Sequence, residues 1–282
     1  MSQPLKSRYL ATKHRLASTL KGRFGVQPLH TAQNDLEQWL DSPLGQRLLT
    51  EEHRCIERSL RCLFGYHLMQ LSISRKLDLC CDSPINHRFQ LNVQPFGESD
   101  LSGCVANFEQ LPLSSDSIDV CLLHHVLEFS TNPHQLLREA SRAIIPHGYL
   151  LIVGFNPWSL YGACRPLAGL VSRSAQWRYN SLRLGRLFDW LRLLDFEPMA
   201  VEKGYYGLPF GQRPSPWMDN LGRSFLSGCG AFYVVSARKQ VMPVTPVKPK
   251  WQATLPEWAP GRARSKASTK IPVAARTQKK SR

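Results

Sequence analysis

Two apolar runs in the middle of the chain decide its fold: Ser117-Ile118-Asp119-Val120-Cys121-Leu122-Leu123 and Tyr149-Leu150-Leu151-Ile152-Val153-Gly154-Phe155. Both runs are short and nearly continuously apolar, which is typical of strands buried on both faces of a parallel sheet. Between them the sequence predicts a helix over 133–145, with Asn132 as its cap and Pro146-His147-Gly148 as its end. Strand, helix and strand with short joints form a βαβ unit, which predicts a parallel sheet with helices outside.

The flanking sequence extends this unit on both sides. Ser42-Pro43 begins a predicted helix that runs towards Gly65, and an apolar stripe over 184–194 indicates another helix. Residues 204–228 indicate a long aromatic-rich loop. Further strands are predicted at residues 66–73, 88–93, 199–201 and 231–236. Because a helix, a strand, a long loop and a strand come last, the predicted fold is α/β, with a Rossmann-like, doubly wound, mostly parallel sheet that ends in an antiparallel edge.

The two ends of the chain carry its formal net charge of +15. Residues 1–25 contain six Lys or Arg and no acid, and residues 238–282 contain twelve against Glu257 alone, whereas residues 26–237 contain 18 basic and 20 acidic side chains. We therefore predict a basic N-terminal arm at 1–25, a folded domain at 26–237 and a basic disordered tail at 238–282, whose Pro-, Lys- and Ser-rich composition cannot offset its ordering entropy. For residues 1–25 an organellar transit peptide is the alternative to a solvated arm.

Cysteine usage and hydropathy bear on the compartment. The eight cysteines are scattered, with no CxxC pair and no spacing typical of zinc ligands. No run approaches the roughly 18 uninterrupted apolar residues of a membrane span. We therefore expect a cytoplasmic protein with no membrane partner, and we predict no metal site.

Four motifs follow one another between residues 107 and 148. They read Asn107-Phe108-Glu109-Gln110-Leu111-Pro112-Leu113, Ser117-Ile118-Asp119-Val120, His124-His125-Val126-Leu127-Glu128-Phe129 and Leu137-Arg138-Glu139-Ala140-Ser141-Arg142-Ala143-Ile144-Ile145-Pro146-His147-Gly148. In order and spacing this string resembles the methyltransferase type 11 family, whose members carry the patterns D-A-E-x-L-P-F, S-F-D-x-V, H-H and E-x-x-R-V-L-K-P-G-G. The resemblance implies the class I methyltransferase fold and the cofactor S-adenosyl-L-methionine.

The resemblance also implies site residues. Asn107 stands where the family has an Asp that contacts the adenine amine, and Phe108 is expected beside the ring. Gly65 stands in the region of the family's glycine-rich first motif, and His124 falls at a strand end beside the cofactor. His124 and His125 are predicted to be catalytic, because ligands of open α/β sheets lie beyond the carboxyl ends of strands and His accepts protons near neutral pH.

Two parts of the family pattern are missing. The family places an acid and G-x-G-x-G after its first strand, whereas the corresponding region here has only Gly65. No acid is evident at the end of the second strand, where the candidates for binding the ribose are Asn92, Gln94, Glu98 and Asp100. Two functions stay open: a methyltransferase acting on an unidentified small-molecule or macromolecular acceptor, and a catalytically silent methyltransferase-like domain that binds a partner.

Three further features each have two interpretations. The tail either binds nucleic acid non-specifically or serves only as a solvated segment. The aromatic-rich turn over 156–162 either lines a substrate pocket or begins a helix capped by Asn156, and both can hold together. His125 and Glu128 form a pair that would need a third ligand to hold a metal.

Overall fold

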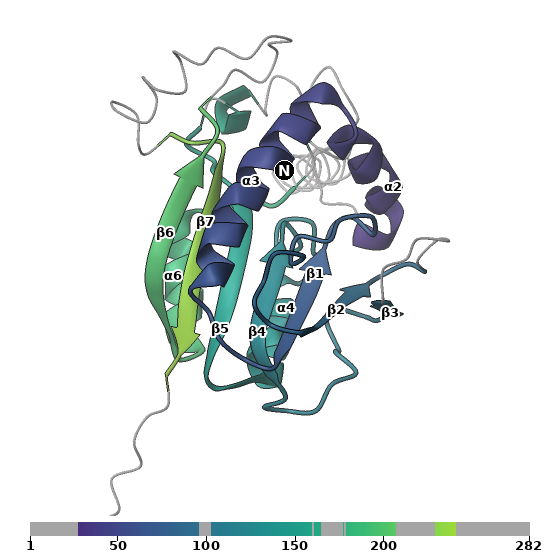
Figure 1. Cartoon of the computed structure of the whole chain (residues 1–282). Helices are drawn as coiled ribbons and strands as arrows, with labels where there is room; N and C mark the ends of the chain where they lie inside the picture. Colours follow the sequence, from purple (N-terminus) through teal and green to yellow (C-terminus); the bar gives the residue numbers. More distant parts are fainter. Residues whose placement is uncertain are drawn as a thin grey trace, which may run out of the picture. The chain divides into compact units, whose positions relative to one another are not determined.

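The two apolar runs lie side by side as the parallel strands β4 (Ile118–His124) and β5 (Ile144–Phe155). The chain passes between them through helix α4 (Pro133–Ala143), so the predicted strand pairing and the bridging helix are confirmed. In the computed structural model both strands lie in a seven-stranded sheet (Figure 1). The structure describes residues 28–95, 103–159, 161–164, 177, 179–206 and 229–240.

The strands of the sheet have the order β3-β2-β1-β4-β5-β7-β6. The other five strands are β1 (His67–Ser72), β2 (His87–Asn92), β3 (Gly103–Val105), β6 (Phe196–Gly204) and β7 (Phe232–Lys239). All neighbours from β3 to β5 are parallel, whereas β7 is antiparallel to both β5 and β6. The predicted mostly parallel sheet with an antiparallel edge is therefore confirmed.

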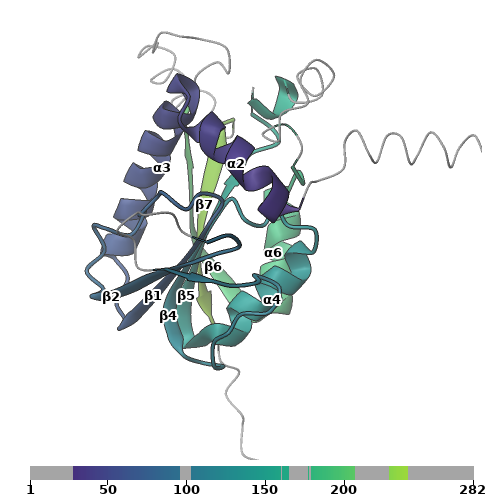
Figure 2. The ribbon, with the colours of Figure 1, turned by 90° about the vertical axis from the view of Figure 1, so that its right-hand side faces the viewer.

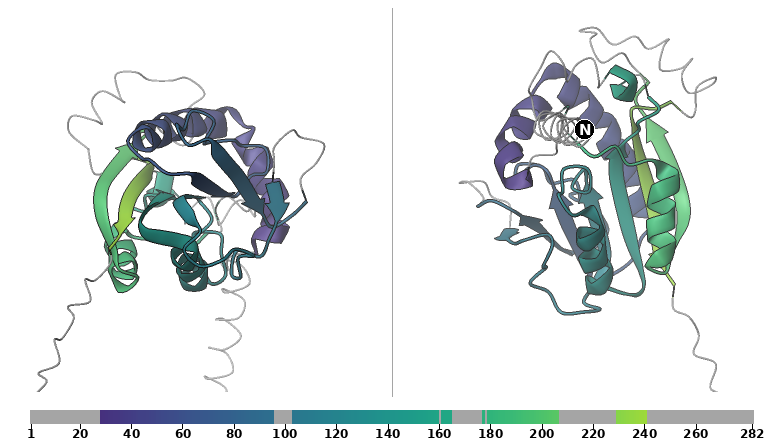
Figure 3. Two further views of the ribbon diagram at one scale, coloured as in Figure 1. Left: turned by 60° about the horizontal axis from the view of Figure 1, so that its bottom comes forward. Right: turned by 180° about the vertical axis from the view of Figure 1, so that it is seen from behind.

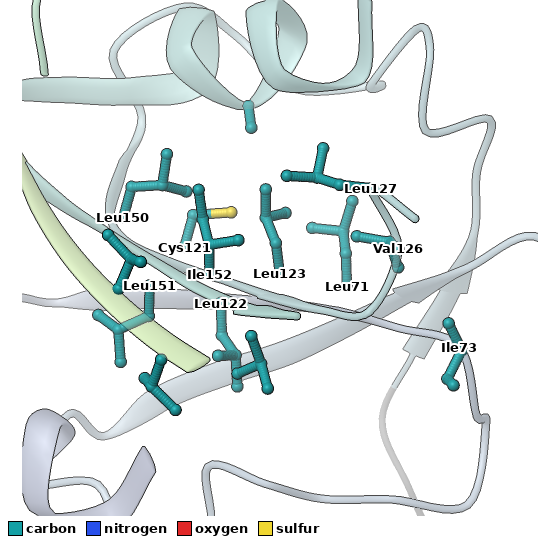
Figure 4. Close-up of a cluster of buried hydrophobic side chains, with 14 of the residues drawn as sticks. Leu71, Ile73, Cys121, Leu122, Leu123, Val126, Leu127, Leu150, Leu151 and Ile152 are labelled. Atoms are coloured by element: carbon teal, nitrogen blue, oxygen red, sulfur yellow. The ribbon is translucent and has the colours of Figure 1, made fainter. Parts of the chain in front are cut away.

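The centre of the sheet is apolar on both faces. Cys121 is paired in register with Leu150, and Leu122 with Leu151, so successive pairs point to opposite faces (Figure 4). These four side chains are completely buried. Burial on both faces explains why the two runs are apolar at nearly every position and do not alternate with polar residues.

Helices cover both faces of the sheet (Figure 2). Helix α3 (Pro43–Arg61) packs on one face, and α4 and α6 (Leu184–Leu193) pack on the other, as the rear view in Figure 3 also shows. α3 begins where the sequence predicts, because the side chain of Ser42 accepts a hydrogen bond from the Gly45 N–H at 3.2 Å. Helix α2 (Leu29–Leu40) precedes it and contacts the ends of β1 and β2.

Two details of α4 differ from the prediction. The helix ends at Ala143, because Ile144 is already extended and pairs with Ile118 as the first residue of β5. Asn132 stands at the N-cap position, but its side-chain amide donates to the Glu109 carboxylate at 3.0 Å and caps no helical N–H. The predicted cap is therefore wrong, and Asn132 ties α4 to the turn that follows β3.

The last strand is longer than the sequence predicts. β7 runs to Lys239, so Arg238 and Lys239 belong to the sheet, although the sequence prediction assigns them to the tail. The Lys239 ammonium donates to the carbonyl oxygens of Ser141 at 2.9 Å and Ile144 at 2.6 Å. These bonds fasten the end of the sheet to the junction between α4 and β5.

Several predicted segments lie outside the described residues: the arm at 1–25, most of the loop at 204–228 and the tail from residue 241. Within the described ranges, no helix has both the length and the apolar character that crossing a membrane requires. Residues 73–86, which join β1 to β2, contain turns and no helix. The carboxyl end of β1 is therefore followed by a loop that packs directly against α2.

Candidate functional site

Helix α2 closes over the carboxyl ends of β1 and β2. Gln33 donates to the Asn92 side-chain oxygen at 2.5 Å, and Glu37 accepts hydrogen bonds from Arg75 in the loop after β1. Both Gln33 and Glu37 are buried on the face of α2 that also carries its apolar residues. This edge of the sheet is where open α/β folds bind their ligands.

A pocket of about 100 Å³ lies at the carboxyl ends of β2, β3 and β4. Side chains from four segments of the chain line it, including Leu29, Val93, Asn107, Phe108, Val126 and Ser130. The Asn107 side-chain oxygen accepts the Glu109 N–H at 2.9 Å, which fixes the turn after β3. Phe108 is buried, so its ring is a fixed wall of the pocket.

The loop after β1 is held by one arginine. The Arg75 guanidinium donates to both carboxylate oxygens of Glu37, at 3.0 and 2.9 Å, and to Asn34 at 3.0 Å. Burial raises the pKa of Glu37, but the hydrogen bonds and charge of Arg75 outweigh burial and lower that pKa overall. The pair therefore stays ionised and ties α2 to the loop that follows β1.

Two buried polar atoms near the end of β2 have no hydrogen-bond partner among the described residues. Asn92 is completely buried, and its Nδ2 finds no hydrogen-bond partner among the described residues. The same holds for Gln33 Oε1, on the side chain that donates to Asn92. A buried donor and a buried acceptor left unpaired are unusual, and they indicate a place where a polar ligand can bind.

A buried network joins α3 to the ends of β1 and β4. His124 Nε2 lies 3.2 Å from Glu52 Oε2, and His125 Nε2 lies 2.9 Å from Glu52 Oε1. The opposite ring nitrogens are also engaged: His124 Nδ1 lies 3.0 Å from Ser72 Oγ, and His125 Nδ1 lies 2.7 Å from Glu128 Oε2. Each of the five side chains is essentially inaccessible to solvent.

Charges within this network shift one another's pKa values. Burial alone raises the pKa of Glu52, but the charge of His125 and hydrogen bonds to both histidines lower it to about 2. Burial lowers the pKa of His125, but the charge of Glu52 and hydrogen bonds to Glu128 and Glu52 raise it to about 10. Burial is the dominant effect at the other two groups, lowering the pKa of His124 and raising that of Glu128.

The backbone of His125 adopts an uncommon conformation. Its φ is 56°, in the left-handed region that residues other than glycine rarely occupy. The ring stacks on Phe155 with centroids 4.1 Å apart. The Phe155 N–H in turn donates to Glu128 Oε1 at 2.6 Å, so His125 and its acid partner are held together. Strain of this kind persists where the surroundings fix a side chain in place.

A second pocket, of about 220 Å³, follows β5. It is lined by Pro157, Trp158, Gly162, Tyr179, Ser181 and Arg183. The Asn156 side-chain oxygen accepts the Trp158 N–H at 3.1 Å, and the Arg183 guanidinium lies 5.3 Å from the centre of the Trp158 ring. The turn that the sequence analysis singles out therefore lines a pocket and also begins a short helical segment at 161–164.

The structure divides the predicted site residues among three places, and His124, predicted to bind the cofactor, does not line the pocket beside Asn107. Asn107 and Phe108 line the first pocket, and His124 and His125 share the buried network. Gly65 precedes β1 and lies at the amino end of the sheet, where an added Cβ would stand 2.4 Å from the Asp119 Cβ. The structure thus gives Gly65 a packing role against Asp119 and does not place it with the other predicted residues.

Sequence reasoning missed Gln33, Glu37, Glu52 and Arg75. Glu52 interrupts the apolar face of α3, where Leu48, Cys55 and Ile56 are all buried. A carboxylate among apolar residues at helical spacing is a signal for a buried, paired acid, and it was present in the sequence. Gln33 and Glu37 interrupt the apolar face of α2 in the same way. Of the four ribose candidates, Asn92 lies at the end of β2, whereas Glu98 and Asp100 are outside the described residues.

Comparison with known proteins agrees with this architecture. Residues 62–152 match the family model Methyltransf_11, described as a methyltransferase domain. Uncharacterized protein YafS of Escherichia coli (strain K12) is 29% identical over 208 residues, which cover 73% of this chain and 82% of that protein.

Solved structures share the fold. A SAM-dependent methyltransferase of Thermotoga maritima, titled a possible histamine N-methyltransferase (TM1293), is 18% identical with a TM-score of 0.50, covering 73% of this chain and 96% of that chain. A chain of the Haloferax volcanii complex containing the Trm112 methyltransferase activator is 13% identical with a TM-score of 0.50, covering 68% of this chain and 91% of that chain. Residues 62–152 therefore match a methyltransferase domain, and the chain has the class I methyltransferase fold.

Proposed function

We propose that the protein is an S-adenosylmethionine-dependent methyltransferase whose cofactor binds across the carboxyl ends of β1, β2 and β3. The observation that carries this proposal is the pocket beside Asn107 and Phe108, in a sheet of the order 3-2-1-4-5-7-6. Both residues were assigned to the adenine from the family resemblance alone, and they line one pocket at the edge where such folds bind ligands.

The residues at this edge fit the adenosine half of the cofactor. Val93, Phe108 and Val126 offer apolar surface for the adenine, and Asn107 offers an amide for its amino group. The unpaired Asn92 Nδ2 and Gln33 Oε1 offer a donor and an acceptor for the ribose hydroxyls. An amide pair can therefore replace the acid that the family has at the end of its second strand.

Methyl transfer needs alignment more than acid–base catalysis. The cofactor, when bound, supplies a methyl group already activated by the positive charge on its sulfur, and the protein's part is to orient the acceptor and exclude water. The Arg75–Glu37 ion pair holds α2 over the carboxyl ends of the strands, and in this position α2 excludes water from the proposed cofactor site. All four ring nitrogens of His124 and His125 already have partners, so the proposal uses neither histidine as a proton acceptor.

We place the methyl acceptor at the pocket that follows β5. Its aromatic walls at Trp158 and Tyr179 suit an apolar or planar group, and Arg183 adds a cation at its rim. This pocket borders the same edge of the sheet as the proposed cofactor site, because β4 and β5 are parallel neighbours.

A specific observation favours a second candidate, a silent methyltransferase-like domain. The loop after β1 has no glycine through which the backbone can approach a cofactor, and its Arg75 is occupied by α2. The adenine pocket, at about 100 Å³, is also smaller than the roughly 300–1,000 Å³ of sites that enclose a whole ligand. α2 would therefore have to shift to admit the complete cofactor.

Calorimetric titration with S-adenosylmethionine separates the two candidates. If the protein is a methyltransferase, we expect saturable binding of S-adenosylmethionine at submillimolar concentration, with one site per chain. S-adenosylhomocysteine, the product left after methyl transfer, should bind more tightly than unrelated adenosine nucleotides. Absence of binding at millimolar cofactor would favour the silent domain.

The basic tail supports a separable proposal, non-specific binding of nucleic acid. Residues 241–282 contain ten Lys or Arg against one acid, with prolines interspersed. Such a segment binds polyanions by releasing counterions and reads little sequence. This proposal concerns the tail alone and does not depend on the cofactor site.

A further inference from the structure

We propose that Glu52, His124 and His125 form a buried binding site for one zinc ion. One donor atom from each side chain lies within 4.8 Å of the others. The two Nε2 atoms lie 3.2 and 2.9 Å from the Glu52 oxygens, somewhat less than the roughly 3.4 Å between neighbouring ligand atoms around a tetrahedral ion with bonds of about 2.1 Å. The site is independent of the proposed methyl transfer, since it lies between α3 and the end of β4.

Both histidines present the same nitrogen to the same carboxylate. His124 Nε2 faces one oxygen of Glu52 and His125 Nε2 faces the other, at 3.2 and 2.9 Å. Two imidazole nitrogens and the two oxygens of one carboxylate make four donors around one point, which is the number that a closed zinc site uses. The left-handed backbone at His125 allows these adjacent residues to turn both rings towards Glu52.

The outward nitrogens are held in the manner of metal-binding histidines. Histidine ligands almost always donate their second ring N–H to a carboxylate, hydroxyl or carbonyl oxygen, which fixes the tautomer and the ring orientation. Here His125 Nδ1 lies 2.7 Å from Glu128, and His124 Nδ1 lies 3.0 Å from Ser72 Oγ. In these tautomers both Nε2 atoms have a free lone pair for the ion.

Charge balance also favours a divalent ion. Glu52 and Glu128 are two buried carboxylates, and among the described residues their ion pairs are formed with His124 and His125, with no Lys or Arg contributing. Protons alone neutralise these two charges only if one is bound to His125 and a second to Glu128, both in the core. A Zn²⁺ ion with two neutral histidines brings the cluster to neutrality.

The donor set selects among metals. Calcium and magnesium prefer oxygen ligands, whereas two imidazoles with one carboxylate are the ligands of known zinc sites. Because the three ligands are completely buried, no substrate can reach the ion, and its role would be to join α3 to β4. An ion so enclosed enters as the chain folds and leaves only when it unfolds.

A neighbouring surface group provides the matched control. His53, Cys81 and Asp82 also have donor atoms within 4.8 Å of one another, but they are partly or fully exposed. His53 follows Glu52 directly in α3. Variants of Glu52 and variants of His53 therefore distinguish an ion in the buried cluster from one held at the surface.

The test is the zinc content of the full-length protein, produced in zinc-supplemented medium and dialysed against EDTA under native conditions. We expect one equivalent of zinc in the wild type and in the double variant His53→Ala/Cys81→Ser, and a loss of at least tenfold in Glu52→Gln. A wild type without zinc shows that protons occupy the cluster, and loss of zinc from the double variant places the ion at the surface; either result overturns the proposal.

Because Glu52→Gln alters a buried residue and can fail to fold, a second measurement uses the wild type alone. Protein produced with cobalt in place of zinc should show the visible absorption of four-coordinate Co²⁺ without a thiolate-to-cobalt band, since the proposed ligands are nitrogen and oxygen. A thiolate band would assign the ion to Cys81, and the absence of cobalt bands would show that the cluster binds no metal; both contradict the buried site.

Discussion

At residue 107 an amide stands where the family resemblance expects a carboxylate. A charged acceptor binds the adenine amine more strongly than a neutral one, by roughly 1 kcal/mol or about fivefold in affinity. We therefore expect Asn107→Asp to tighten S-adenosylmethionine binding about fivefold and Asn107→Ala to weaken it by a similar factor, both measured by calorimetry.

The control for this pair is Gln110→Ala, at an exposed position in the same turn that does not line the pocket. Its affinity for the cofactor should equal that of the wild type. If Asn107→Ala binds as tightly as the wild type, Asn107 does not contact the adenine and the carried-over site is wrong.

Glu128 carries a second prediction at this scale. Its two oxygens hold His125 Nδ1 and the Phe155 N–H, so Glu128→Ala removes the partner of one ring nitrogen of His125 and of one buried backbone donor. Removing one member of such a pair costs roughly 3–5 kcal/mol in the free energy of unfolding, measured by urea denaturation. Glu128→Gln keeps an acceptor for Phe155 and should cost less; equal losses for the two variants would show that the hydrogen bonds contribute little.

The residues that sequence reasoning found and missed differ in how far apart their partners lie. Asn107 and Phe108 were predicted from a contiguous motif and line one pocket, and their contact with a cofactor stays a prediction. Glu52 was missed because its partners are 72 and 73 residues away along the chain, beyond any local motif. Gly65 was misplaced because it precedes β1, whereas ligand loops follow the carboxyl ends of strands.

Among the elements, α2 contacts the loop after β1 through the buried ion pair of Glu37 with Arg75. Glu37 is buried and its pKa is lowered by Arg75 from the ordinary value of 4.5. The folded state therefore binds this proton more weakly than the unfolded state, so the stability from the pair is complete above about pH 4.5 and is lost as the pH falls towards the lowered pKa.

We accordingly expect Glu37→Gln to lower the free energy of unfolding by roughly 1.5–3 kcal/mol at pH 7. The difference between the variant and the wild type should shrink as the pH falls below about 4.5, which denaturant titrations at several pH values would measure. The exposed ion pair between Arg54 and Glu51 provides the control, since Glu51→Gln should change stability by less than about 1 kcal/mol. A Glu37→Gln effect that does not depend on pH would contradict this account.

The elements themselves were predictable where burial left a clear pattern. β4 and β5 were predicted because they are nearly continuously apolar, and α4 was predicted because its apolar residues follow the helix period. β3 was not predicted, because Gly103–Val105 is a three-residue strand that is exposed throughout. α2 was not predicted either, because Gln33 and Glu37 stand within its apolar stripe and only partners distant in sequence explain their burial.

For the whole molecule, we expect the basic tail to determine DNA binding and to contribute little to the stability of the folded part. Deleting residues 241–282 should abolish binding to duplex DNA and change the melting temperature by less than about 2 °C. If the tail neutralises about six phosphates, the logarithm of affinity should fall against the logarithm of salt concentration with a slope of about −5 in the full chain.

A full-length variant with the ten Lys and Arg of residues 241–282 changed to Gln separates charge from length. It should bind DNA as weakly as the deletion. DNA binding that survives both changes, with its salt dependence intact, would place the nucleic-acid contact elsewhere on the protein.

The position of β7 has a consequence for how the chain matures during synthesis. Of the described strands β7 comes last in sequence, yet it lies between β5 and β6, with residues 232–238 paired to β5 and residues 232–239 to β6. Until residues 232–239 emerge, the backbone of both earlier strands has no partner on that side, and unpaired strand edges promote association between chains. A chain that stops before Phe232 should therefore aggregate rather than fold to a smaller domain, because β5 and β6 would each expose an unpaired edge.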